Sequence, residues 1–297
     1  MTNTLLDLSK QPDLRFIGQL AGEIAMEAGK LDIPVFIAGA MARDLLLAHG
    51  YGINTGRRTE DIDWAMSVES WDQFEALKAA LIANGRFAAG KHVHRLRYRQ
   101  SLPVDLMPFG GIENSHGVIS WPPDHHTEMT VLGFNDAYQN SVTVRLPGDI
   151  DVQVASLPGL ALLKLLAWNE RHLQFPKKDA HDFALIARHY IDAGNQDRLY
   201  EEFVFLHEDP GFDYELASAR MLGYDVGQTF GELPTNVVLD ILTRETDVQG
   251  RLSFVAAMPV AADKALAIVE NFRIGLTESG LLGTSRSHIR HDQSGAF

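Results

Sequence analysis

The sequence contains no cysteine. This absence excludes disulfides, thiolate zinc sites and a cysteine nucleophile, and it fits a reducing compartment. Long apolar runs are also missing, since none approaches the roughly 18 residues that a membrane span needs. The first residues lack the basic segment and apolar stretch of a secretory signal. We therefore expect a cytoplasmic protein that does not contact a membrane.

Common phosphate-binding and nucleophile motifs are absent too: there is no Walker loop, dinucleotide fingerprint or nucleophile elbow. Basic residues are in deficit, with 26 Lys and Arg against 39 Asp and Glu, a net charge of −13. Such a charge argues against a nucleic-acid surface spread over the whole protein, because backbone phosphates would be repelled.

One segment, residues 86–104, is basic and holds no acid. Arg95, Arg97 and Arg99 alternate in it, so a strand there would project all three guanidinium groups from one side. Such a stripe could grip phosphates. The alternative is a solvated strand face.

Three carboxylates are the most informative groups present. Asp61 and Asp63, at i and i+2, share one face of an extended strand, and Asp105 lies between apolar neighbours on another predicted strand. Together they would complete an all-oxygen site for Mg²⁺, the cation that bridges nucleotide phosphates in phosphoryl transfer. Asp105 could ligate the metal and accept the proton of an attacking hydroxyl. The alternative for Asp105 is structural pairing with Arg97 or Arg99.

A glycine follows the apolar run 33–38, as in a strand that enters a tight turn. Gly39 and Ala40 would let the backbone approach phosphates closely, and the next helix would supply amide donors. Arg43 lies one turn into that helix, where it would reach a phosphate or pair with an acid. Both roles remain open from the sequence.

The second half of the chain offers another set of charges. Lys164 interrupts an apolar helical stretch over residues 160–169, so it either reaches the surface or faces a cleft that carries anions. Lys178, Asp179 and Asp182 begin a predicted helix over residues 178–193. These side chains would line the far wall of a nucleotide cleft, or form an ordinary ion-paired pair of helices.

The periodicity of apolar residues predicts an α+β protein. Strands are expected over 35–38, 61–66, 95–99, 104–108, 142–146 and 150–154. Helices are expected over 14–30, 40–49, 70–84, 178–193, 236–243 and 261–276. We place a catalytic domain at 1–155 and a helical domain at 156–297 that completes the nucleotide cleft, with a disordered tail from about 283.

Four blocks resemble the AbiEii/AbiGii toxin nucleotidyltransferases of the DNA polymerase β superfamily. They are Ala38–Asp44, Thr59–Asp63, Val104–Gly110, and Leu163-Lys164 together with Lys178–Asp182. The resemblance implies a polymerase β-like mixed sheet flanked by helices, followed by a mainly helical domain. Asp61 and Asp63 would hold metal, Lys164 would touch phosphate, and Asp179 or Asp182 would support the site.

The resemblance also implies an activity: Mg²⁺-dependent transfer of a nucleoside monophosphate from an NTP, with two ions during turnover and Mn²⁺ as a substitute. RNA, especially the tRNA 3′ end, is the expected acceptor, and an antitoxin protein the expected partner. Gly39-Ala40 departs from the usual Gly-Ser or Gly-Gly. Two alternatives remain: transfer to a protein or small molecule, which the overall acidity favours, and a nucleotide-binding module without turnover, which Ala40 permits.

Overall fold

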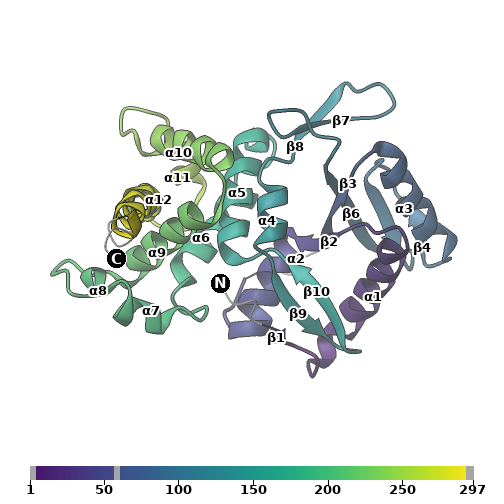
Figure 1. The fold of residues 1–297 in the computed structure, drawn as a ribbon, viewed down its shortest axis with the longest axis horizontal. Coiled ribbons are helices and arrows are strands. Elements are labelled where there is room, and N and C mark those ends of the chain that lie inside the picture. Colours follow the sequence, from purple (N-terminus) through teal and green to yellow (C-terminus); the bar gives the residue numbers. More distant parts are fainter. Residues whose placement is uncertain (1–4, 57–60, 292–297) are drawn as a thin grey trace, which may run out of the picture. The chain divides into compact units, whose positions relative to one another are not determined.

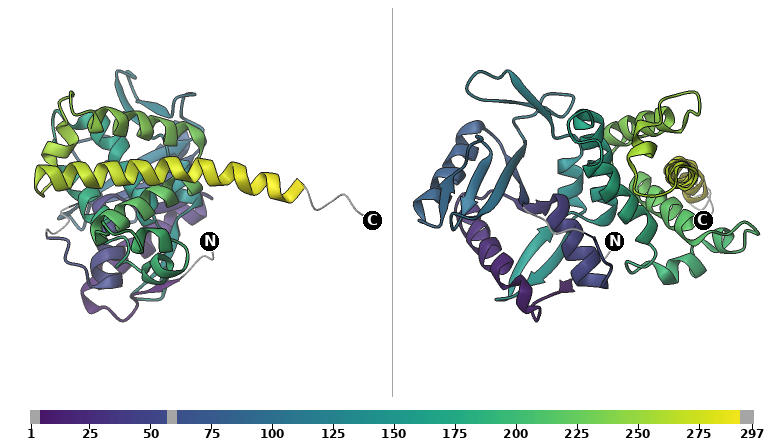
Figure 2. Two further views of the ribbon diagram at one scale, coloured as in Figure 1. Left: turned by 90° about the vertical axis from the view of Figure 1, so that its left-hand side faces the viewer. Right: turned by 180° about the vertical axis from the view of Figure 1, so that it is seen from behind.

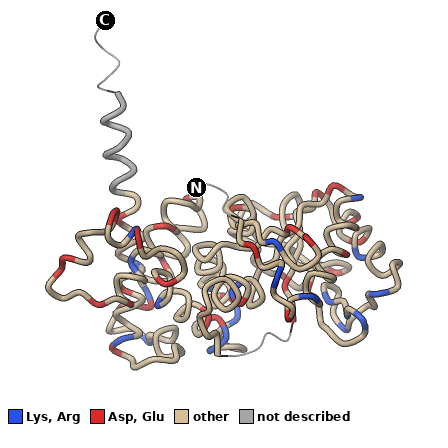
Figure 3. Tube along the Cα trace, turned by 90° about the horizontal axis from the view of Figure 1, so that it is seen from below, with Lys and Arg blue, Asp and Glu red and all other residues tan. Residues whose placement is uncertain are grey.

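The computed structural model describes residues 5–56 and 61–291, with side chains as far as residue 280. The chain divides at Leu160 into two compact units, whereas the sequence predicts a boundary near residue 155. Helix α5 (Leu157–Arg171) contains the division. Lys and Arg occur at several separate places along the trace, with Asp and Glu between them (Figure 3).

The described residues of the first unit form an eight-stranded mixed sheet (Figure 1). Its strands, in spatial order, are β1 (Leu6–Asp7), β9 (Val142–Leu146), β10 (Ile150–Val154), β2 (Val35–Ala38), β3 (Ile62–Val68), β6 (Leu102–Gly110), β5 (Arg95–Tyr98) and β4 (Phe87–Ala89). The predicted hairpin over 142–154 is present, with β9 and β10 antiparallel.

Helices and a small second sheet accompany these strands. They are η1 (Pro12–Leu14), α1 (Arg15–Lys30), α2 (Gly39–Arg43), α3 (Trp71–Ala83), α4 (Phe134–Gln139), and the pair β7 (Val118–Trp121) and β8 (Thr127–Thr130). α2 continues into a π-helical segment, η2 (Asp44–Gly50). Ser70 caps α3 by accepting a hydrogen bond from the backbone N–H of Gln73 (3.3 Å), which satisfies one of the amide donors at the start of the helix.

The centre of the sheet is apolar, which explains why these strands are recognisable in the sequence. β3 pairs antiparallel with β2 and parallel with β6. Trp64, Ala65 and Met66 of β3 are almost fully buried, as expected of a strand covered on both faces. The polar residues of β3 and β6 therefore stand out from a hydrophobic background.

The second unit is helical. After α5 it comprises α6 (Lys178–His189), α7 (Gln196–Glu201), α8 (Val204–His207), α9 (Tyr214–Thr229), α10 (Glu232–Thr246), α11 (Ser253–Ala257) and α12 (Ala262–His291). α9 packs closely against the first part of α12, and the end of α12 projects beyond the other helices of this unit (Figure 2). A Cβ at Gly223 would lie 2.0 Å from the carbonyl oxygen of Phe272. Only glycine permits this approach of two backbones.

Several predicted bounds differ from the observed ones. The helix predicted over 178–193 ends at His189, and α12 includes the tail from 283 as far as His291. Residues 292–297 and 57–60 lie outside the described residues. Across the described part of the chain, no helix is both long and apolar enough to cross a membrane.

Candidate metal and nucleotide site

Three acids converge at one end of the central strands. Each of Asp61, Asp63 and Asp105 offers a carboxylate oxygen that lies within 4.8 Å of the other two. Asp63 on β3 is directly opposite Asp105 on β6 in the parallel register. Asp61 precedes β3, which begins at Ile62, so it joins the group from the end of the loop rather than from the strand. The convergence that the sequence predicted is therefore present.

Asp105 has a partner that the sequence did not predict. Arg95 donates from Nε to Oδ1 and from Nη2 to Oδ2 of Asp105, both at 2.6 Å. Its Nη2 also lies 3.6 Å from Oδ2 of Asp61. The hydrogen bonds to Asp105 raise the pKa of the Arg95 guanidinium, so this group remains charged. The predicted alternative of pairing with Arg97 or Arg99 named the wrong arginines.

The predicted arginine stripe is interrupted. β5 ends at Tyr98, and Arg99 and Gln100 have φ of +45° and +64°, as in the type I′ turns that join antiparallel strands. Because Arg99 lies in the turn, it no longer follows the alternation of the strand. Arg97, opposite Pro103, and Arg99 are both exposed, but only Arg97 lies on the strand.

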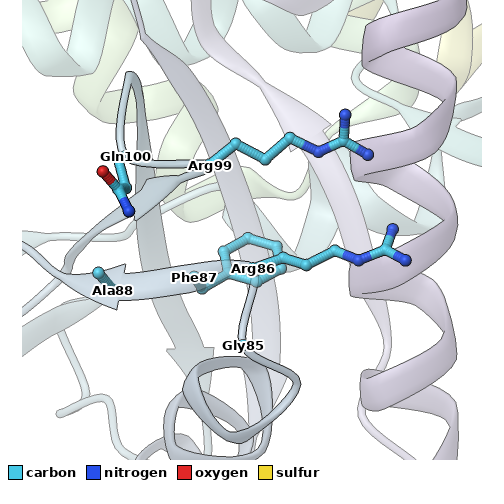
Figure 4. A pocket seen from close by; sticks show the side chains of 6 residues that line it. All are labelled: Gly85, Arg86, Phe87, Ala88, Arg99 and Gln100. Atoms are coloured by element: carbon cyan, nitrogen blue, oxygen red, sulfur yellow. The ribbon is translucent and has the colours of Figure 1, made fainter.

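A pocket of about 310 Å³ lies beside this turn (Figure 4), and it is lined by Gly85, Arg86, Phe87, Ala88, Arg99 and Gln100. Both arginine side chains extend toward α1 (Figure 4). Arg86 pairs there with Glu23, and the guanidinium of Arg99 lies over the ring of Phe16, 5.8 Å from its centroid. None of the three converging acids lines this pocket.

Gly39 follows β2 and lies against the acidic site. Its φ is +67°, and a Cβ at this position would lie 1.9 Å from Oδ2 of Asp63. Glycine is required here on both counts. Ala40, next in α2, is buried.

Arg43 is 1% exposed, and its Nε donates to Oδ1 of Asp44 at 2.9 Å. Of the two roles predicted for Arg43, the structure shows the pairing with an acid. The predicted contact of Arg43 with a phosphate stays a prediction.

The second unit contains a buried charge cluster. Lys164 is 5% exposed, and its Nζ lies 3.2 Å from Oδ1 of Asp179 and 2.6 Å from Oδ2 of Asp182. Arg171 also donates to both oxygens of Asp179, at 2.7 and 2.8 Å. Lys178, at the start of α6, is partly exposed.

These contacts shift the pKa values of the cluster. Burial alone would lower the pKa of Lys164, but Asp182 and Asp179 outweigh it and raise the pKa. Burial would raise the pKa of Asp179, but Arg171 and Lys164 lower it. The geometry thus favours the ion-paired alternative for these residues, and the contact of Lys164 with phosphate stays a prediction.

Comparisons with known proteins bear on this site. The family described as "Nucleotidyl transferase AbiEii toxin, Type IV TA system" matches residues 25–259. A comparison with curated protein sequences found no match.

Solved structures give more distant likenesses. ANT(2")-Ia in complex with adenylyl-2"-tobramycin is 16% identical, with a TM-score of 0.36 over 64% of this chain and 97% of that one. A nucleotidyltransferase-like protein from Paracoccidioides brasiliensis is 17% identical, with a TM-score of 0.39 over 64% and 90%. The Thermotoga maritima CCA-adding enzyme complexed with tRNA is 13% identical, with a TM-score of 0.24 over 92% and 83%. These scores are low, so the assignment depends on the family match.

Proposed function

This chain belongs to the nucleotidyl transferase AbiEii toxin family and is a nucleotidyltransferase, and from that premise we propose that it transfers a nucleoside monophosphate from an NTP to the 3′ hydroxyl of an RNA. We propose tRNA as the acceptor and a role as the toxin of a toxin–antitoxin pair. The observation that carries the proposal is the convergence of Asp61, Asp63 and Asp105.

The donor set fits Mg²⁺. All three side chains supply oxygen, the ligand that Mg²⁺ prefers, and two oxygens on opposite sides of one ion are about 4.2 Å apart. Adjacent ligands of such an ion are about 3.0 Å apart, and the three oxygens here lie within 4.8 Å of one another, so the carboxylates would have to move together to bind one ion. A pair of ions roughly 3.5–4 Å apart would need less adjustment. Mn²⁺, with similar ligand preferences, would substitute.

Mg²⁺ bound here would neutralise the triphosphate and lower the pKa of the acceptor hydroxyl. Asp61 and Asp63 would hold the ion, which would supply charge neutralisation at the α-phosphate. Asp105 orients or deprotonates the acceptor hydroxyl, whose oxygen attacks the α-phosphorus while the bond to the β-phosphate oxygen breaks and pyrophosphate leaves. The backbone at Gly39 and Ala40 approaches the phosphates. Most of the rate enhancement would come from positioning and charge neutralisation.

An RNA acceptor is supported by the local charge of the chain. Residues 86–104 hold five Lys and Arg and no acid, and the exposed Arg97 lies on the same strand as Arg95, two residues from the acidic site. Phosphates of an RNA near its 3′ end would be attracted to such a segment.

Transfer of label tests this function. The protein is incubated with Mg²⁺ and each α-labelled NTP in turn, with purified tRNA, total RNA or lysate protein as acceptor. We expect label on tRNA with one or a few of the NTPs. The Asp63→Asn variant should lose this labelling, whereas Asp240→Asn, the same charge change at an exposed position of α10, should retain it.

Full labelling by a folded Asp63→Asn variant would contradict the assignment of the site. Label on lysate protein but not on RNA would contradict the acceptor and favour the alternative of a protein substrate. The toxin role is tested separately, by asking whether induced expression stops growth of a bacterial host and whether the Asp63→Asn variant does not.

A further inference from the structure

The pairing of β5 with β6 fixes the guanidinium of Arg95 against the carboxylate of Asp105. Arg95 and Asp105 are directly opposite on the antiparallel strands β5 and β6. The backbone N–H of Leu106 donates to the carbonyl of His94 at 2.8 Å, so the next pair, Arg95 and Asp105, is of the non-hydrogen-bonded type in which side chains are closest. The two-point contact of the guanidinium with the carboxylate is therefore built into the strand register.

Charge balance explains why an arginine is needed at this position. Asp63 and Asp105 are directly opposite on β3 and β6, and like charges placed so are destabilising. Asp61 adds a third negative charge within 4.8 Å. Arg95 neutralises part of this repulsion, because it contacts both Asp105 and Asp61.

The same contact opposes a metal ion. Arg95 occupies one lone pair on each oxygen of Asp105, and its positive charge would lie within a few ångströms of any cation that Asp105 ligates. Like charges at that separation repel strongly where water is partly excluded, and Asp105 is only 7% exposed. Asp105 is thus a weaker metal ligand in this state than an unpaired carboxylate would be.

We propose that Arg95 is a counter-ion that keeps Asp105 from ligating a cation until the triphosphate is bound. This inference rests on the proposed function. Asp61 and Asp63 take the ion that arrives with the NTP. The negative charge of the phosphates then draws the guanidinium of Arg95 away from Asp105, and Asp105 becomes available for a second ion. Arg95 is a positioning residue in this scheme, because it acts through Asp105.

The test measures Mn²⁺ binding to the whole protein without NTP, by electron paramagnetic resonance of the free ion. Arg95→Gln should bind Mn²⁺ about tenfold more tightly than the wild type, because it lacks one positive charge beside the site. A tenfold change is about 1.4 kcal/mol, the size expected for two partly screened charges at short range. Arg95→Lys keeps the charge and should bind like the wild type. Arg97→Gln makes the same charge change two residues away on β5 and should also bind like the wild type.

Two further readouts separate a charge effect from a folding defect. Without metal, Arg95→Gln should have a lower Tm than the wild type, because the carboxylates lose their counter-ion. Added Mn²⁺ should raise the Tm of Arg95→Gln by more than it raises the Tm of the wild type. A non-hydrolysable NTP analogue should narrow the difference in Mn²⁺ affinity between the two proteins. If the analogue left the difference in Mn²⁺ affinity unchanged, the proposed movement of Arg95 away from Asp105 on NTP binding would be contradicted.

Equal or weaker Mn²⁺ binding by Arg95→Gln would overturn the inference, as would tighter binding by Arg95→Lys to the same extent as by Arg95→Gln. The Asp63→Asn variant distinguishes this failure from failure of the proposed function. If Asp63→Asn binds Mn²⁺ as the wild type does, the metal site itself is wrong. If Asp63→Asn loses binding and Arg95→Gln is unchanged, only the role of Arg95 is wrong.

Discussion

The carboxylate of Asp63 lies against the Cα of Gly39, so closely that a Cβ on Gly39 would be 1.9 Å from Oδ2 of Asp63. The turn after β2 and the acidic site are therefore packed as one unit. A side chain at position 39 would have to displace the carboxylate of Asp63.

We expect Gly39→Ala to lose Mn²⁺ binding and nucleotidyl transfer. Gly52→Ala is the matched control, because Gly52 has φ of +69° and a Cβ added there would meet no atom within 4 Å. Both variants should lose roughly 1–2 kcal/mol of stability from the left-handed backbone, and only Gly39→Ala should lose metal affinity. Urea denaturation measures the stability of both variants, and titration with Mn²⁺ measures their metal affinity. Equal metal affinity in the two variants would show that the contact with Asp63 is unimportant.

Lys164 provides a second prediction. Lys164→Met should reduce the free energy of unfolding by about 3–5 kcal/mol, because it leaves Asp179 and Asp182 buried without this partner. The KM for NTP, measured on the folded protein, should be unchanged. Lys178→Met, at a partly exposed position of the next helix, should change stability by no more than about 0.5 kcal/mol. A raised KM in Lys164→Met would instead support the phosphate contact that the sequence suggested.

The pKa of Asp179 predicts a pH dependence. Because it is lower in the folded protein than its ordinary value of 3.8, the ionised carboxylate stabilises the fold above that value, and the contribution is lost as pH falls through the lowered folded pKa. The difference in unfolding free energy between the wild type and Asp179→Asn should be constant from about pH 5 to 7. Below about pH 4 it should shrink. Urea denaturation across this range measures it, and a difference that grows toward acid would have the wrong sign.

An RNA acceptor implies a salt effect at Arg97. If this exposed side chain contacts a phosphate, Arg97→Gln should reduce the slope of log Kd for tRNA against log salt by about 1. Arg251→Gln, an exposed arginine of the second unit, should leave the slope unchanged. Equal slopes for all three proteins would place the RNA elsewhere.

The strands of the first unit were predictable because they are short apolar runs bounded by turns. The hairpin of β9 and β10 was predicted with its observed bounds, since both strands alternate and Pro147-Gly148-Asp149 separates them. The π-helical turns of η2 were not predicted. Apolar periodicity over Leu45, Leu46 and Leu47 does not distinguish them from an α-helix.

The acidic site shows what a sequence alone leaves open. That Asp61, Asp63 and Asp105 meet follows from three acids on predicted strands and a resemblance to a known family. The partner of Asp105 does not follow, because it depends on the register of β5 against β6. That register places Arg95 opposite Asp105, whereas Arg97 is opposite Pro103. Arg99 leaves the stripe because its φ is positive. An arginine in a sequence does not indicate a positive φ, so this turn could not be predicted.

Ala38, Asp63, Asp105 and Arg95 occupy one transverse row across β2, β3, β6 and β5. If β6 slipped by one residue against β3, Asp105 would point to the opposite face of the sheet and Val104 or Leu106 would take its place. Such a misaligned sheet would still bury apolar residues, yet it would offer a divalent cation only Asp61 and Asp63 and would lack the carboxylate proposed for a second ion. Binding of a second ion with an NTP analogue would therefore report whether a preparation of this protein has reached the correct alignment of its strands.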